Sequence, residues 1–285
     1  PIGINRRQFI DELGTEKFRR RKASLQSMYA GHKVVLSIER VDYTKGILRR
    51  FAAIEKFLRD RKNKTECVFI FIGIPTRGEV KEYKELLDQI QKKVGWINGQ
   101  FSDIGYTPVQ FINKVIPMVD LCALYSVAYV LMVTPLIDGM NLVAKEYVAA
   151  KRDRPGVLIL SEMAGAAAEL SDAVIINPND VEQINESLVK ALEMPENEQR
   201  KALERMQRLV SRYTVKRWAE GFLSELQTIR QHNQRNRRKK LAGNVVQRVK
   251  EAYGRAERRL LILDYDGTLS PFRARPEDAF PSRDI

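Results

Sequence analysis

The sequence contains few of the residues that build metal sites or covalent cross-links. Its 285 residues include two cysteines and two histidines. Cys67 lies inside an apolar run and Cys122 in a helical pattern, which favours two reduced thiols in the core over a disulfide or a metal pair. His32 and His232 are likewise poor candidates for metal ligands. The chemistry of this chain therefore has to come from other residue types.

Long hydrophobic stretches are also missing. No apolar run approaches the ~18 residues that are needed to span a bilayer. The first residues, PIGINRRQF, lack the apolar core of a signal peptide. With 44% hydrophobic residues the chain can nevertheless bury a sizeable core. We expect a soluble, cytoplasmic protein without a membrane partner.

Acidic residues are fewer than basic ones, and the formal net charge is +13. Clustered Lys and Arg can neutralise the phosphates of nucleic acid. The densest basic runs, at residues 19–22 and 235–240, fall on helical or linker patterns without interleaved aromatic residues. They indicate solvated faces and a linker, so we expect no nucleic-acid partner. Anionic small molecules are a better reason for part of the charge.

Short apolar runs alternate with helical patterns along most of the chain. Nearly continuous apolar stretches predict strands covered on both faces, at residues 33–41, 67–75, 129–136, 156–163 and 173–178. Apolar residues at three- and four-residue spacing predict helices at residues 46–60, 79–94, 108–127, 141–151 and 181–193. The alternation is typical of an α/β fold with a doubly wound parallel sheet. Ligands bind beyond the carboxyl ends of such strands, here the loops at 39–46, 75–78, 137–141 and 161–166.

The last third of the chain has a different pattern. Residues 196–258 are almost wholly helical and highly charged, which predicts closing helices followed by a connector. A new apolar strand is then expected in RRLLILDYDGTLSPF, residues 258–272. We therefore expect one domain over residues 1–230, a charged helical linker over 231–257 and the incomplete start of another domain over 258–285.

The first cluster with chemical potential is ERVDYTKG, after the first predicted strand. Arg40 and Lys45 flank a turn between a strand end and a helix start, where backbone N–H groups and the helix dipole favour an anion. Two cations at that place suit a diphosphate. The alternative is a pair of surface charges with Asp42 as a helix cap.

The second cluster follows the strand predicted at 129–136. Asp138 and Gly139 form a turn, and the amides of Met140, Asn141 and Leu142 are expected to be unpaired donors at a helix N-terminus. Such donors can hold phosphate or sugar oxygens. The alternative assigns Asp138 to capping of the helix.

Two charged residues follow one turn later in the same helix. Glu146 lies on a face that could reach a polyol such as a ribose, much as an acidic residue holds ribose hydroxyls in dinucleotide-binding folds. In the alternative interpretation, the side chains of Lys145 and Glu146 are exposed to solvent. Neither cluster decides the function by itself.

Six segments occur together in one order and carry a resemblance to a known family. The chain resembles the trehalose-6-phosphate synthases, retaining glycosyltransferases with two Rossmann-like domains (GT-B), over roughly residues 1–230. Its PIGIN start is similar to the hinge between their two domains, which implies the C-terminal half of the fold without its N-terminal partner and an inactive isolated fragment. The segments are ERVDYTKG, IPTRGEVKEY, VGWINGQF, TPLIDGMNLVAKEYVAA, AGAAAEL and NPND.

The resemblance implies a transfer of glucose from UDP-glucose to glucose 6-phosphate, and it assigns the site. Arg40 and Lys45 match residues that grip the UDP phosphates, and Asp138 matches the acid that holds glucose hydroxyls; these three would be catalytic. The backbone at 139–142 lies beside the sugar, and Glu146 matches the glutamate that binds ribose. No metal and no cofactor are implied, since Arg and Lys stabilise the leaving diphosphate.

Three departures from the family pattern put activity in doubt. Trp96 replaces an arginine that the family associates with the acceptor's phosphate, so the acceptor-binding residues remain unknown. Ile137 replaces an arginine and Ala168 an asparagine. Two hypotheses therefore stay open, a glucosyltransferase and a non-catalytic regulatory module fused to a trehalose-6-phosphate phosphatase. Homo-oligomerisation is also left open.

The tail resembles a different enzyme family. LLILDYDGTL is similar to the first motif of haloacid dehalogenase-type phosphatases, such as trehalose-6-phosphate phosphatase domains. This resemblance implies that Asp264 is a phosphorylated nucleophile, that Asp266 is an acid/base and that both help to hold Mg²⁺ in a complete domain. The later motifs of that family are not in this sequence, so we expect residues beyond about 258 to be poorly packed.

Overall fold

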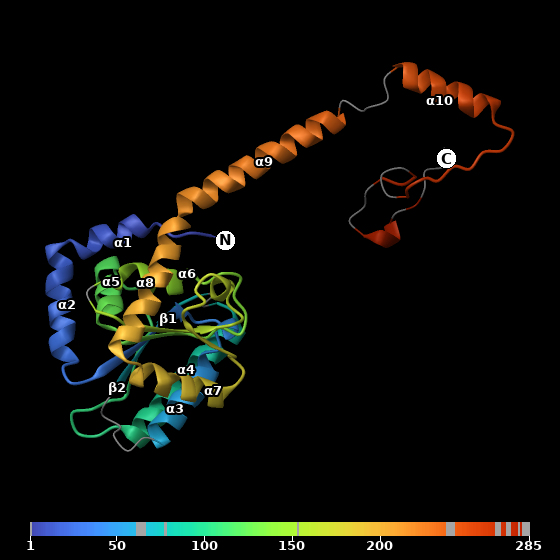
Figure 1. Ribbon diagram of the computed structural model, residues 1–285. Helices are drawn as coiled ribbons and strands as arrows, with labels where there is room; N and C mark the ends of the chain where they lie inside the picture. The colour runs from blue at the N-terminus through green and yellow to red at the C-terminus, as the bar shows by residue number, and fades with distance from the viewer. Residues whose placement is uncertain are drawn as a thin grey trace. The chain divides into compact units, whose positions relative to one another are not determined.

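The computed structural model describes most of the chain. The described residues are 2–60, 67–76, 79–152, 154–237, 243–265, 269–271, 275–278 and 280. The chain divides into two compact units, Pro1–Leu223 and Ser224–Ile285. The first unit holds the sheet and the loops in which the candidate site residues lie (Figure 1).

A parallel sheet of six strands forms the centre of the first unit. The strand order is β3-β2-β1-β4-β5-β6, so the direction of winding reverses between β1 and β4. In open α/β sheets a crevice for ligands forms at this switch point, outside the carboxyl ends of the strands. The strands are β1 (Lys33–Arg40), β2 (Cys67–Ile74), β3 (Val109–Ile112), β4 (Val130–Val133), β5 (Val157–Ser161) and β6 (Val174–Ile176).

Both faces of the sheet are covered, because successive side chains of a strand point to opposite faces. Val34, Leu36 and Ile38 of β1 belong to one apolar cluster, whereas Val35 belongs to another. All of these residues are at least 95% buried. The expected doubly wound α/β architecture is therefore confirmed.

Helices form a layer on each side of the sheet (Figure 1). Those with buried residues in the Leu36 cluster are α1 (Arg6–Leu13), α2 (Glu16–Met28), α5 (Met118–Val127), α6 (Leu142–Ala150) and α8 (Glu196–Arg212). Those with buried residues in the Val35 cluster are α3 (Ile47–Asp60), α4 (Lys81–Phe101) and α7 (Val181–Glu193). The 3-10 turns are η1 (Tyr43–Lys45), η3 (Gly165–Ala168) and, in the tail, η4 (Pro276–Asp278).

One helix prediction is wrong in part. Residues 108–127 were expected to form a single helix, but β3 occupies Val109–Ile112 and α5 starts only at Met118. The apolar residues of VQFI fit either spacing, and four residues are too few to separate the two periods. Pro117 then delays the helix, because it restricts the residue before it to extended conformations.

The helices after residue 212 are α9 (Val215–Arg237) and α10 (Gly243–Arg255), in agreement with the predicted charged helical stretch. No helix within the described ranges is long and apolar enough to cross a membrane.

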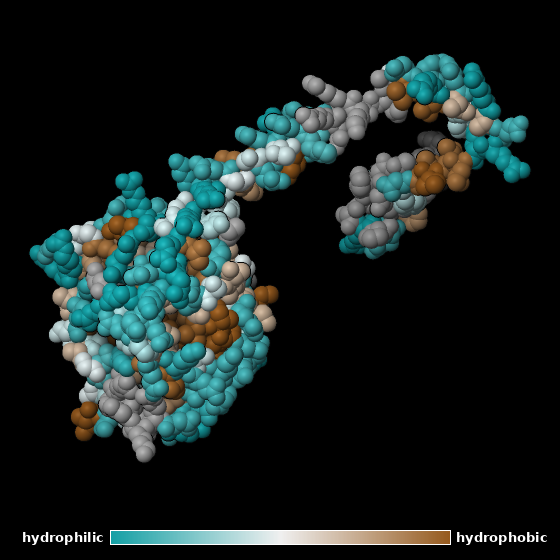
Figure 2. All heavy atoms as spheres, viewed as in Figure 1, coloured by the Kyte–Doolittle hydropathy of each residue, from teal (hydrophilic) through white to brown (hydrophobic). Residues whose placement is uncertain are grey.

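The strand expected at the start of residues 258–272 is not formed. The described residues 258–265 contain no strand. Leu260 and Ile262 are 84% and 87% exposed, and Figure 2 shows hydrophobic atoms at the surface of this segment. A strand is stable only when neighbouring strands pair with it and cover its apolar face, and the described part of this unit offers none. The poor packing expected beyond 258 is confirmed for these residues.

A glycine links β1 to α3 at the switch point. Gly46 has φ +67°, and a Cβ there would lie 2.5 Å from the carbonyl oxygen of Thr134, the residue after β4. Only a residue without a side chain lets the two loops come this close.

We predict that Gly46→Ala destabilises the protein far more than Gly31→Ala. Both glycines have positive φ, which costs an L-residue about 1–2 kcal/mol. Gly31 has open space around its Cβ position, whereas at Gly46 the added clash should raise the loss above ~3 kcal/mol. Chemical denaturation of both variants measures the difference. Equal losses in unfolding free energy would show that the contact between the loops is not tight.

Candidate functional site

The loop after β1 is shaped by an aspartate. The Asp42 carboxylate accepts hydrogen bonds from the Thr44 amide at 2.9 Å and from the Thr44 hydroxyl at 2.8 Å, and it caps the 3-10 turn η1. The Tyr83 hydroxyl donates to its other oxygen at 3.3 Å. Burial alone would raise the pKa of Asp42, but these hydrogen bonds outweigh it and lower the pKa. The capping role considered for Asp42 is therefore confirmed, and η1 holds Lys45 at its end.

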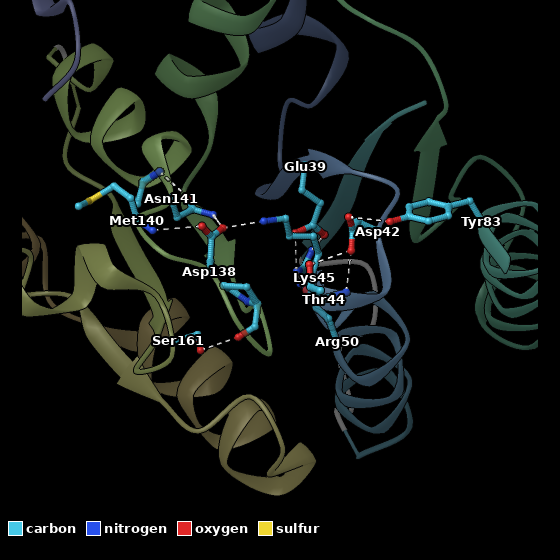
Figure 3. Close-up of polar contacts among 12 residues, drawn as sticks. Glu39, Asp42, Thr44, Lys45, Arg50, Tyr83, Asp138, Met140, Asn141 and Ser161 are labelled. Atoms are coloured by element: carbon cyan, nitrogen blue, oxygen red, sulfur yellow. Dashed lines mark hydrogen bonds and ion pairs between the residues drawn. The ribbon is translucent and has the colours of Figure 1, made fainter. Parts of the chain in front are cut away.

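Lys45 meets Asp138 across the switch point. Its Nζ donates to the Asp138 carboxylate at 2.7 Å, although the two residues are 93 positions apart in sequence (Figure 3). The side chains are only 11% and 15% exposed. Lys45 is therefore not the solvated surface charge of the alternative interpretation, and two of the three expected catalytic residues lie in contact.

Two further donors converge on Asp138. The Asn141 side-chain amide donates to one carboxylate oxygen at 3.0 Å, and the Met140 N–H donates to the other at 3.2 Å (Figure 3). Burial alone would raise the pKa of Asp138, but the hydrogen bonds from Lys45, Asn141 and Met140 together lower it. The carboxylate is thus ionised at neutral pH and is a strong acceptor.

The cap of α6 is Asn141 and not Asp138. Asn141 has φ +71°, and its side-chain oxygen accepts from the Ala144 N–H at 3.1 Å. Asn is one of the few residues that adopt a left-handed conformation at small cost. Of the three amides expected to be free, Met140 donates to Asp138, whereas for Asn141 and Leu142 no acceptor lies among the described residues. Those two donors remain for a ligand.

The two loops of the switch point are joined through their backbones. The Thr44 carbonyl accepts from Leu136 N–H at 2.7 Å and from Ile137 N–H at 3.3 Å. The Ser161 hydroxyl, at the end of β5, donates to the carbonyl of Pro135 at 2.7 Å (Figure 3). The loops of the site are therefore joined to one another by hydrogen bonds.

A second brace comes from the segment after β5. Gly165 N–H donates to the Asp138 carbonyl at 2.9 Å, and Ala166 N–H donates to the Met140 carbonyl at 2.7 Å. A Cβ on Gly165 would lie 2.2 Å from the carbonyl oxygen of Gly139. The turn at Asp138 and Gly139 is thus held by a segment other than the one that carries Lys45.

Glu146 is held one turn into α6. It accepts from the Tyr125 hydroxyl of α5 at 3.0 Å, and the hydrogen bonds of Lys45 and Asp138 within the described residues go to other partners. Burial raises the pKa of Glu146, and the tyrosine hydrogen bond opposes the shift. Lys145 is 2% exposed and bonds the Glu169 carboxylate at 2.7 Å and the Ile2 carbonyl at 2.8 Å. Assigning Lys145 to solvent is therefore wrong.

The remaining predicted residues are exposed to different degrees. Arg40 ends β1 at the same sheet edge as Lys45, with its side chain exposed near Asp42. Ile137 is 67% exposed in the loop beside Asp138. Ala168, also exposed, ends the 3-10 turn η3.

Trp96 does not lie at this edge of the sheet. Tyr83, in the first turn of α4, contacts Asp42, and Trp96 follows thirteen residues later, about 20 Å along the helix. Its indole N–H donates to Glu55 of α3 at 3.4 Å, and its side chain is exposed. Trp96 therefore lies apart from the Lys45–Asp138 pair.

A buried ion pair behind the site was not predicted from the sequence. The Arg50 guanidinium contacts the Glu39 carboxylate with both of its terminal nitrogens, and the two side chains are 2% and 5% exposed. Burial raises the pKa of Glu39, and Arg50 opposes that shift. An available signal was the spacing, because Arg50 falls three residues after Ile47 and one before Phe51, on the apolar face of α3.

The tail holds one of its two predicted aspartates within the described residues. Asp264 is exposed, and Asp266 lies outside the described residues. No group of three or more potential metal ligands occurs within the ranges that the structure describes.

The strand order and the charged loops at the switch point define a doubly wound α/β domain of the nucleotide-binding type. Residues 1–228 match the model of glycosyltransferase family 20. The chain belongs to this family.

Similar proteins extend the comparison. The chain is 42% identical to the bifunctional trehalose-6-phosphate synthase/phosphatase of Thermoproteus tenax, an alignment that covers all of this chain and 39% of that protein. A trehalose-phosphate synthase from Burkholderia xenovorans in complex with glucose-6-phosphate is 36% identical with a TM-score of 0.76, over 80% of this chain and 51% of that one. An E. coli structure bound with UDP-2-fluoro glucose is 35% identical with a TM-score of 0.74, over 79% and 50%. The chain thus spans about half or less of the length of these relatives.

The state of Asp138 can be tested directly. We predict that its carboxyl titrates below 3.8, its ordinary pKa, so the stability it contributes is complete above that value and is lost as the pH falls through the lowered pKa. Lys45→Met should raise the pKa of Asp138, because it removes the strongest of the hydrogen bonds that lower it. Carbon-detected NMR titration measures both values, with Lys81→Met, at an exposed lysine of α4, as the control.

A wild-type pKa of Asp138 at or above 3.8 would contradict the contact with Lys45 in solution. An unchanged pKa in Lys45→Met would contradict it independently.

Proposed function

We propose that this chain is the sugar-nucleotide-binding half of a trehalose-6-phosphate synthase, which transfers glucose from UDP-glucose to glucose 6-phosphate with retention of configuration. The observation that carries the proposal is the Lys45–Asp138 pair at the carboxyl ends of β1 and β4. It sets a cation for a diphosphate beside a carboxylate for a sugar. The relatives that match more than three quarters of this chain and have these activities in their names support the same assignment.

Each group of the donor has a matching group on the protein. Lys45 and Arg40 would bind the diphosphate, and the unpaired amides of Asn141 and Leu142 would add neutral donors at the start of α6. Asp138, kept ionised, accepts hydrogen bonds from glucose hydroxyls. Glu146 would accept from the ribose, once its hydrogen bond with Tyr125 is shared or exchanged.

The reaction needs positioning and charge stabilisation more than a protein nucleophile. The bond between the anomeric carbon and the UDP oxygen breaks, and a bond from the same carbon to the acceptor hydroxyl oxygen forms on the same face. The acceptor's proton passes to the departing phosphate oxygen, so no atom is left over. Lys45 and Arg40 stabilise the negative charge that develops on UDP, which is the largest contribution available in such a site.

Most of the acceptor site would lie on the other domain of the two-domain fold. Trp96 stands outside the acceptor site in this proposal, because it lies four turns into α4 beside Glu55. The donor residues Lys45 and Asp138 are intact and in contact, which favours the enzyme over the non-catalytic alternative.

The tail belongs to the same proposal. Residues 1–230 would form the donor-binding domain, 231–257 a linker, and 258–285 the beginning of a phosphatase domain in which Asp264 is the nucleophile and Asp266 the acid/base. The bifunctional synthase/phosphatase of Thermoproteus tenax supports this, because its alignment covers the whole of this chain. Mg²⁺ would be held only by the complete domain.

The proposal predicts that Lys45→Ala weakens UDP binding by about tenfold or more, since a charge-assisted contact of ~1.5–3 kcal/mol is lost. Calorimetric titration of the 285-residue chain with UDP measures this. Lys201→Ala, an exposed lysine on α8, is the control and should bind as the wild type does. If the wild-type chain fails to bind UDP at millimolar concentration, the proposed function is wrong.

Asp138→Asn should distinguish binding of the nucleotide from binding of the sugar. UDP lacks the glucose, and the variant no longer presents a carboxylate beside the diphosphate or holds Lys45 as an ion pair. We therefore expect UDP affinity to stay equal or to rise, while the additional affinity of UDP-glucose over UDP disappears. Competition titrations with UDP and UDP-glucose measure both affinities. Weaker UDP binding in this variant would argue that Asp138 supports the diphosphate site and does not hold sugar.

A further inference from the structure

Arg50 occupies a position where a charged side chain needs a reason. It lies in the first turns of α3 and is 2% exposed, among the buried residues Ile47, Phe51 and Ile54 of the same helix. Burying a guanidinium is costly unless its donors are paired with good geometry. A leucine at this place would cover the sheet without that cost.

The partners of Arg50 come from three segments that meet at the switch point. Its terminal nitrogens contact the carboxylate of Glu39, at 3.0 Å for one of the two contacts (Figure 3). Its Nε donates to the Thr134 hydroxyl at 2.8 Å, and a terminal nitrogen also donates to the Lys45 carbonyl at 3.2 Å. A single planar group therefore joins β1, the turn η1 and the residue after β4.

Each of these contacts bears on a ligand-binding group. Glu39 is the residue before Arg40, and successive side chains of a strand point to opposite faces, so the inward direction of Glu39 sets the outward direction of Arg40. The contact with the Lys45 carbonyl holds the backbone from which the Lys45 side chain reaches Asp138. Thr134 begins the loop that carries Asp138.

We propose that Arg50 is a positioning residue for the diphosphate site: through Glu39, the Lys45 carbonyl and Thr134 it holds the cations Arg40 and Lys45 in register with Asp138. The proposal rests on the proposed function, because it assumes that Lys45 meets a diphosphate. Arg50 itself touches no ligand. Lysine cannot replace it, since an ammonium lacks the planar fork that satisfies three partners at once.

The test is UDP binding by the 285-residue chain with Arg50→Lys. We expect the UDP affinity to fall about tenfold, because small displacements of binding groups carry large penalties. The matched control is Arg49→Lys, the adjacent residue, which is exposed and contacts only the Asn179 carbonyl among the described residues. It should bind UDP as the wild type does.

A double-variant cycle shows whether Arg50 acts through Lys45. If it does, Arg50→Lys lowers the UDP affinity by a smaller factor in the Lys45→Ala background, where only Arg40 is left to be positioned, than in the wild type. A purely structural role would instead lower the UDP affinity by the same factor in both backgrounds. Full additivity therefore overturns the proposal.

A second variant distinguishes a loss of protein stability from a displacement of the binding groups. Glu39→Leu combined with Arg50→Met removes both buried charges, a change that often leaves stability unaltered or higher. We expect this protein to fold, as judged by circular dichroism, and to bind UDP about tenfold more weakly, because the loops have lost their shared anchor. Wild-type affinity in the folded double variant overturns the proposal.

A measurement on the wild type needs no variant to fold. The Nε resonance of Arg50 should shift during a UDP titration with the same midpoint as the calorimetric curve, and the Nε resonance of Arg49 should not. An unmoved Arg50 resonance in a chain that binds UDP overturns the positioning role alone. A chain that does not bind UDP overturns the proposed function instead, so the two failures are distinguishable.

Discussion

The hydrogen bonds of the Thr44 carbonyl with Leu136 and Ile137 are the constraint on which the site depends. They fasten the loop after β1 to the loop after β4, at the point where the winding of the sheet reverses. A parallel sheet without this fastening would still leave two strand ends near each other, but their loops would be independent. Gly46 makes the fastening possible, because only glycine lets its backbone approach Thr134.

On that framework two opposite charges are placed at hydrogen-bonding distance. Lys45 and Asp138 satisfy each other, so neither charge is left buried and unpaired. A diphosphate and a sugar would each offer one of them a new partner. The same pair therefore satisfies both charges without a ligand, and in the proposed function it would offer a cation to the diphosphate and a carboxylate to the sugar. Asn141 and Met140 also donate hydrogen bonds to Asp138 and would hold it in place during such an exchange.

The sequence predicted five of the six strands and most helices, because continuous apolar runs and three- to four-residue spacing are local signals. It failed at β3, an edge strand of four residues inside a stretch with helical spacing. It failed again after residue 258, where an apolar run has the composition of a strand but no neighbour among the described residues to pair with. The local pattern of a segment shows which secondary structure it favours, but not whether neighbouring strands are present to pair with it.

The sequence alone determined the α/β class and the loops at the switch point. Asp42 as a cap was part of its alternative interpretation, and Arg40, Lys45 and Asp138 were expected to be catalytic from the family resemblance. Only the tertiary structure decided that Lys45 contacts Asp138 and that Asn141 rather than Asp138 caps α6. It also decided that the buried Arg50 donates to the Lys45 carbonyl. The reason is physical. Periodicity records which face of an element is apolar, whereas contacts between residues 84 or 93 positions apart depend on which strands become neighbours in the sheet.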